Sequence, residues 1–79
     1  MANAGKILSR MRHNPRDWRI EDLKVLADRY GVVYRQQGTS HVTFRHPVAG
    51  IVPVPAARPI KVVYIRRFLA FIDALEDAK

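Results

Sequence analysis

The pattern of apolar positions divides the chain into segments with helical spacing and segments with strand-like alternation. Apolar residues that recur three and four positions apart lie on one face of a helix. One such set is Ile20, Leu23, Leu26, Ala27 and Tyr30, and another is Ile65, Phe68, Leu69, Ile72 and Leu75. This spacing predicts helices over residues 20–30 and about 61–75. Gly31 is a natural end for the first helix, because glycine readily adopts the left-handed conformation that closes a helix.

Three short segments between these helices are typical of β-strands: residues 32–36, 41–45 and 51–54. The second alternates, so that Val42 and Phe44 face one side while His41, Thr43 and Arg45 face the other. Gly38 lies between the first two segments and predicts a hairpin connection. Pro53 has no N–H to donate to a neighbouring strand, so we expect the third strand at a sheet edge.

The order of these elements predicts an α+β fold with an α-β-β-β-α domain over residues 19–79. We expect a sandwich in which a three-stranded antiparallel sheet carries both helices on one face. The opposite face would stay open and would carry His41, Thr43 and Arg45. Residues 1–18 are expected to form a short N-terminal helical arm, which ends at Asn14 before Pro15 and is anchored to the domain by Trp18.

The charge distribution is the first indication of function. The 79 residues include 14 Lys and Arg against 7 Asp and Glu, which gives a formal net charge of +7. No acidic residue lies between Asp28 and Asp73, so the centre of the chain is basic. A basic centre on so small a domain favours a polyanion such as RNA, or an acidic protein, as the partner.

The composition also limits the cellular setting that we expect. The chain has no cysteine, which fits a cytoplasmic protein without disulfides. The longest apolar run, residues 49–57, is interrupted by Gly50, Pro53 and Pro55. Such a run is too short to span a bilayer, and we expect no membrane association.

His41 is the candidate catalytic residue. It opens the second strand segment and shares the open face with Arg45. Spacing alone does not distinguish a catalytic histidine from an exposed strand residue. Of the other two histidines, His13 is expected to be an exposed loop residue and His46 to be part of a turn.

The residues around His41 favour chemistry on RNA over chemistry with a metal. No glycine-rich phosphate loop, carboxylate pair or set of metal ligands accompanies it, so we expect no metal and no cofactor. Histidine and arginine, supported by Ser40, Tyr34 or Lys61, suit cleavage of a phosphodiester. Histidine moves protons at neutral pH, arginine holds a phosphate, and RNA provides its own 2′-OH nucleophile.

Residues 20–75 resemble the HicA family of bacterial toxins, also called YcfA-like mRNA interferases. The resemblance covers nearly all of the chain beyond the arm, and its most specific part is the centre. The matching segments, in order, are the helix that ends at Tyr30-Gly31, the run Gly38-Thr39-Ser40-His41-Val42-Thr43-Phe44-Arg45-His46-Pro47, the run Val52-Pro53-Val54-Pro55, and the last helix.

The resemblance implies a fold similar to a double-stranded-RNA-binding domain. It implies a toxin of a toxin–antitoxin system, which cuts mRNA without a metal and has His41 as the catalytic general acid or base. It also implies a HicB-like antitoxin that masks the site, and the net charge suggests that this partner is acidic. We expect supporting or RNA-binding roles for Ser40, Thr39, Gly38, Arg35, Arg45, Lys61, Arg66 and Arg67.

Two departures from the family pattern bear on the site. Thr39 occupies the position where the family has a glycine before the serine, which affects the hairpin beside His41. Ala56 and Ala57 follow Pro55 where the family often has a histidine, which removes a second candidate for proton transfer. Two alternatives to the enzyme stay open. One is a non-catalytic RNA-binding module of the double-stranded-RNA-binding type, and the other is a protein whose basic face docks an acidic chain.

Overall fold

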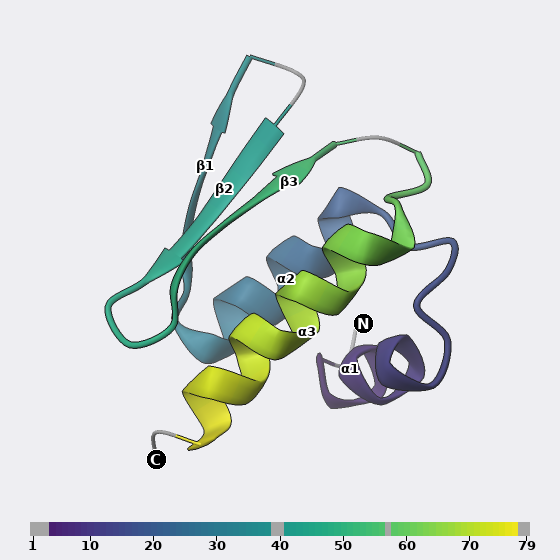
Figure 1. Cartoon of the computed structure of the whole chain (residues 1–79), viewed down its shortest axis with the longest axis horizontal. Helices are drawn as coiled ribbons and strands as arrows, with labels where there is room; N and C mark the ends of the chain where they lie inside the picture. Colours follow the sequence, from purple (N-terminus) through teal and green to yellow (C-terminus); the bar gives the residue numbers. More distant parts are fainter. Residues whose placement is uncertain (1–3, 39–40, 57, 78–79) are drawn as a thin grey trace.

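The computed structural model describes residues 4–38, 41–56 and 58–77. Within these residues, three strands form one antiparallel sheet in the order β1-β2-β3, and α2 and α3 lie on one face of it (Figure 1). This arrangement confirms the predicted α+β fold and places β3 at a sheet edge, as Pro53 indicated. The elements are α1 (Ala4–His13), α2 (Ile20–Tyr30), β1 (Val33–Gln37), β2 (His41–His46), β3 (Gly50–Pro55) and α3 (Val62–Asp77).

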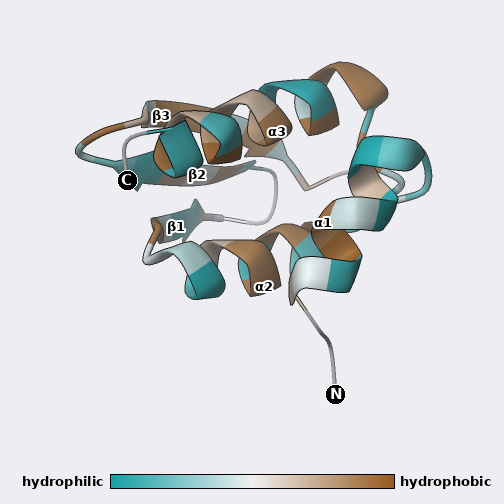
Figure 2. Ribbon diagram, turned by 90° about the horizontal axis from the view of Figure 1, so that it is seen from below, coloured by the Kyte–Doolittle hydropathy of each residue, from teal (hydrophilic) through white to brown (hydrophobic). Residues whose placement is uncertain are grey.

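The helix α1 adds a layer that the sequence did not predict. It lies on the side of α2 and α3 that faces away from the sheet, so the order of layers is sheet, α2 with α3, and α1 (Figures 1 and 2). Leu8 and Met11 of α1 are buried in the same core as the rest of the domain. Arg12 forms an ion pair with Asp73 of α3, and this carboxylate raises the pKa of the guanidinium. The segment that we expected to be an arm is thus packed into the domain.

The linker between α1 and α2 is held by hydrogen bonds. The indole N–H of Trp18 donates to the carbonyl of Asn14 at 2.6 Å, and the N–H of Ile60 donates to the carbonyl of Trp18 at 2.9 Å. The Trp18 ring is partly buried against the core. Trp18 therefore anchors the N-terminal segment, as predicted.

Helix α2 ends where the sequence indicated. Gly31 has φ 69°, and its N–H donates to the carbonyl of Ala27. Helix α3 differs slightly from the prediction, because Phe71 is buried and Leu69 only partly so. The Phe71 ring stacks on Phe68 with 6.1 Å between ring centroids. The buried stripe of α3 is therefore shifted toward Phe71 relative to the predicted set.

The core fixes which face of β2 is exposed. Phe44 is fully buried, and its ring centroid lies 5.7 Å from that of Tyr34 and 5.0 Å from that of Phe68. Val42 is fully buried on the same face. A slip of one residue would turn both side chains out to solvent, so this packing specifies the strand register. As a result, the alternate residues of β2 face away from the helices.

Candidate nucleic-acid interface

The open sheet face consists of the strand residues that point away from α2 and α3. On β2 these are His41 and Arg45, which are exposed, and Thr43, which is partly exposed. Their orientation confirms the prediction from strand alternation. Their partners in the neighbouring strands complete the face with Val33, Arg35, Ile51 and Pro53.

Two arginines converge on this face from adjacent strands. Arg35 of β1 pairs with Thr43 of β2, and Val33 pairs with Arg45. A pocket of 310 Å³ is lined by Arg35, Thr43 and Arg45 together with Val33 and Tyr34. Cross-strand neighbours have Cβ atoms about 4.5–5.5 Å apart. The two guanidinium groups and the threonine hydroxyl can thus reach one phosphate group.

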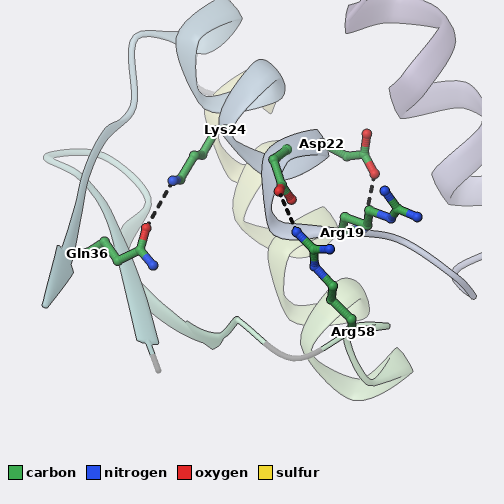
Figure 3. A network of polar contacts seen from close by, with 6 residues as sticks. Arg19, Asp22, Lys24, Gln36 and Arg58 are labelled. Atoms are coloured by element: carbon green, nitrogen blue, oxygen red, sulfur yellow. Dashed lines mark hydrogen bonds and ion pairs between the residues drawn. The ribbon is translucent and has the colours of Figure 1, made fainter. Parts of the chain in front are cut away.

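The two arginines of the pocket have no carboxylate partner in the part of the chain that the structure describes. Within the described residues, neither Arg35 nor Arg45 forms an ion pair. The three carboxylates of α2 are engaged elsewhere: Glu21 pairs with Arg58 at 3.3 Å, Asp22 accepts the N–H of Arg19 at 3.0 Å (Figure 3), and Asp28 lies near the Tyr34 hydroxyl. The open sheet face therefore keeps a positive charge that an anion can neutralise.

Tyr34 lines this pocket, but its ring lies on the other side of the sheet. The ring packs against Phe44 on the helix side of the sheet, with Lys24 Nζ 5.8 Å from its centroid. Burial raises the pKa of the Tyr34 hydroxyl, and the nearby Asp28 carboxylate raises it further. Lys24 donates in turn to the Gln36 side chain at 3.1 Å, which ties α2 to β1 (Figure 3). Tyr34 is therefore structural here rather than part of the open sheet face.

His41 stands at one end of the open sheet face. Thr43, two residues further along β2, is about 6.8 Å away, since a strand advances about 3.4 Å per residue. Arg45 is twice as far along the strand. The Cα partners of His41 are Gln37 of β1 and Pro55 of β3. The face thus places a histidine at a fixed distance from a pair of arginines.

The structure does not bring all of the predicted basic residues to this face. Lys61 precedes α3, and its carbonyl accepts the N–H groups of Tyr64 and Ile65. Arg67 lies 5.7 Å from the Tyr64 ring and lines a 400 Å³ groove between α3 and β3, which Ile51 and Pro53 also line. Arg66 is about 100° further round the helix and does not line this groove. Only Arg67 of these cations borders the open sheet face.

The residues on either side of His41 are described in part. Gly38 has φ +66°, a left-handed conformation that favours glycine, as expected for a hairpin. Thr39 and Ser40 lie outside the described residues. Of the other histidines, His13 is exposed as expected but is the last residue of α1 rather than a loop residue. His46 Nδ1 accepts the N–H of Val48 at 3.0 Å in the turn after β2, as expected.

Apolar residues on the open sheet face were not singled out from the sequence. Val33 is 66% exposed and Ile51 is 60% exposed, and they flank Arg45 on opposite sides. Both lie in predicted strands, but the sequence analysis did not say which side of the sheet they face. The strand pairing with Arg45 shows that they face solvent, and period-two alternation from a known register would have found them.

Among residues 4–38, 41–56 and 58–77, no three His, Asp or Glu side chains are close enough to share a metal ion. In the same part of the chain, no helix is both long and apolar enough to cross a membrane.

The chain was also compared with known proteins. No protein-family model, no curated protein and no solved structure matches it. The open sheet face and the sequence pattern around His41 are therefore the features that bear on function.

Proposed function

We propose that the chain is a metal-independent endoribonuclease that binds RNA on the open sheet face and uses His41 as a general acid or base. The observation that supports this most is the exposure of His41 on the same face as Arg35, Thr43 and Arg45, in a region of the chain without carboxylates. Arginine pairs are suited to bidentate binding of phosphate.

The chemistry follows from these groups. The RNA 2′-oxygen attacks the adjacent phosphorus, the bond from phosphorus to the 5′-oxygen breaks, and the products are a 2′,3′-cyclic phosphate and a 5′-hydroxyl. His41 either accepts the proton of the 2′-OH or donates a proton to the leaving 5′-oxygen, and a water molecule carries out the other proton transfer. Arg35 and Arg45 bind the phosphate and stabilise the negative charge that grows in the transition state.

The finer assignment is to the HicA-like mRNA interferases, with a fold similar to double-stranded-RNA-binding domains. It is supported by the run from Gly38 to Pro47 and by the order of α2, the three strands and α3. In this proposal the chain is a toxin that cuts mRNA in the cytoplasm. An acidic HicB-like antitoxin would cover the open sheet face, where Val33 and Ile51 offer apolar contacts and the arginines offer charge.

A non-catalytic RNA-binding module is the second candidate. One observation favours it: no described residue forms a hydrogen bond with the His41 side chain. Catalytic histidines are commonly oriented by a partner that holds one ring nitrogen. Such a module would bind the same RNA through the arginines and leave it intact.

Treatment with EDTA should leave the rate of RNA cleavage unchanged. The two-metal mechanism requires carboxylate ligands, and the sequence has none between Asp28 and Asp73. Cleavage of a labelled oligoribonucleotide would be followed with purified protein in excess EDTA and after addition of Mg²⁺ or Mn²⁺. Loss of cleavage in EDTA that either ion restores would contradict the proposed chemistry.

Replacing Arg35 and Arg45 together with glutamine should weaken RNA binding and reduce its salt dependence. Each phosphate contact to a single strand contributes about 0.7 to the slope of log K against log salt, so the slope should become shallower by about 1.4. The matched control is Arg66→Gln, since Arg66 is exposed on α3 away from the open sheet face. Binding to a non-cleavable oligonucleotide would be measured by fluorescence anisotropy at several salt concentrations. Equal slopes for the double variant and the parent would place the RNA on another surface.

A further inference from the structure

A second basic surface lies at the end of α1 and in the linker that follows it. A pocket of 740 Å³, here called the basic pocket, is lined by Ser9, Arg10, Arg12, His13, Asn14, Arg16 and Trp18. Helix α1 and the sheet lie on opposite sides of α2 and α3 (Figures 1 and 2). The basic pocket and the open sheet face are therefore separate surfaces.

Ion pairs among the described residues neutralise only one of the three arginines in the basic pocket. Arg12 pairs with Asp73, and Glu76 lies 3.6 Å from it. Within the described residues, neither Arg10 nor Arg16 forms an ion pair. The only carboxylate in residues 4–20 is that of Asp17, which does not line the pocket.

The helix dipole of α1 does not cancel this charge. Its C-terminal end is equivalent to roughly half a negative charge. The carbonyl of Arg10 also accepts the N–H of Asn14 at 2.8 Å, so part of this end is already satisfied. Two guanidinium groups outweigh the remaining partial charge. The pocket thus favours an anionic ligand.

Trp18 adds an aromatic surface to this charged pocket. Its N–H already donates to the Asn14 carbonyl, so the polar atom of the indole is satisfied within the protein. The ring is partly buried against the core, which fixes its position, and it still lines the pocket. What the ring can offer a ligand is a stacking contact. Cations beside an aromatic ring are typical of sites that bind phosphates and bases of single-stranded nucleic acid.

We propose that the basic pocket is a second RNA-binding surface, in which Arg10 and Arg16 bind phosphates and a base stacks on Trp18. The inference shares its ligand class with the proposed function but not its residues, and it requires no catalysis by His41. A surface on the far side of the molecule would remain accessible when a partner covers the open sheet face. The chain would then stay bound to RNA in its masked form.

Trp18 is the only tryptophan in the sequence, so tryptophan fluorescence reports on the basic pocket. Titration with a short oligouridylate should quench Trp18 emission in a saturable manner, after correction for absorption with free N-acetyltryptophanamide. Replacing Arg10 and Arg16 together with glutamine should weaken this binding by about tenfold or more, since charge-assisted hydrogen bonds to phosphate are lost. Both side chains are exposed, so the variant should keep the parental circular dichroism spectrum.

The matched control is the variant in which Arg35 and Arg45 are replaced, which should keep the parental quenching of Trp18. That result would support the basic pocket even if cleavage by His41 were never observed. Cleavage without any change in Trp18 emission would overturn the basic pocket while leaving the proposed function intact. Equal quenching of the parent and the Arg10 and Arg16 variant would also overturn it. Quenching by polyglutamate as strong as that by oligouridylate would indicate a surface for acidic proteins instead of RNA.

Discussion

Replacement of His41 with alanine is expected to slow RNA cleavage by about 10²- to 10⁴-fold, the usual cost of losing general acid–base catalysis. Folding should be retained, because His41 is exposed and Val42 and Phe44 hold its strand on the core. RNA affinity should also be nearly retained, since Arg35 and Arg45 are unchanged. Single-turnover cleavage and anisotropy with a non-cleavable oligonucleotide would measure the two effects separately.

His46→Ala is the internal control for this experiment. It removes the acceptor of the Val48 N–H, a hydrogen bond of 3.0 Å in the turn after β2. Loss of such a bond typically costs about 0.5–1.5 kcal/mol of stability. The control should therefore lower the unfolding midpoint slightly and leave cleavage close to the parental rate. An undiminished rate in the His41 variant would remove His41 from the chemistry and favour the non-catalytic RNA-binding module.

Replacement of Met11 with alanine is expected to destabilise the whole domain by about 2–5 kcal/mol. Met11 is fully buried in the core although it belongs to the N-terminal segment. The total stability of a chain of 79 residues is roughly 4–12 kcal/mol, so this loss is a large fraction of it. Urea unfolding followed by far-ultraviolet circular dichroism would measure the change.

The matched control for Met11 is Arg10→Gln, an exposed position on the same helix. Exposed substitutions of this kind usually change stability by less than about 0.5 kcal/mol. If α1 were only an appended arm, Met11→Ala would leave the unfolding midpoint of the domain unchanged. The same result would mean that the burial of Leu8 and Met11 contributes little to the fold.

The elements of the domain could be predicted from the sequence because their signals are local. Helix α2 has apolar residues at helical spacing and ends at Gly31, whose left-handed backbone is the property that glycine provides. Strand β2 alternates, and this alternation predicted that His41 and Arg45 lie on the face opposite Val42 and Phe44, which are buried in the structure. The exposed position of His41 could therefore be predicted before any contact was known, whereas spacing alone did not assign it a catalytic role.

Only the tertiary structure decided which distant residues share a surface. Arg35 and Arg45 meet because β1 pairs with β2 in one register, whereas Arg66, which is similar in charge, lies on a helix away from the open sheet face. The sequence likewise predicted a helical arm at the N-terminus but not the surface against which it packs. The covering surface is the far side of α2 and α3, where Arg12 meets Asp73, 61 positions later in the chain. Local patterns carry no information about such pairings, because they depend on how the whole core packs.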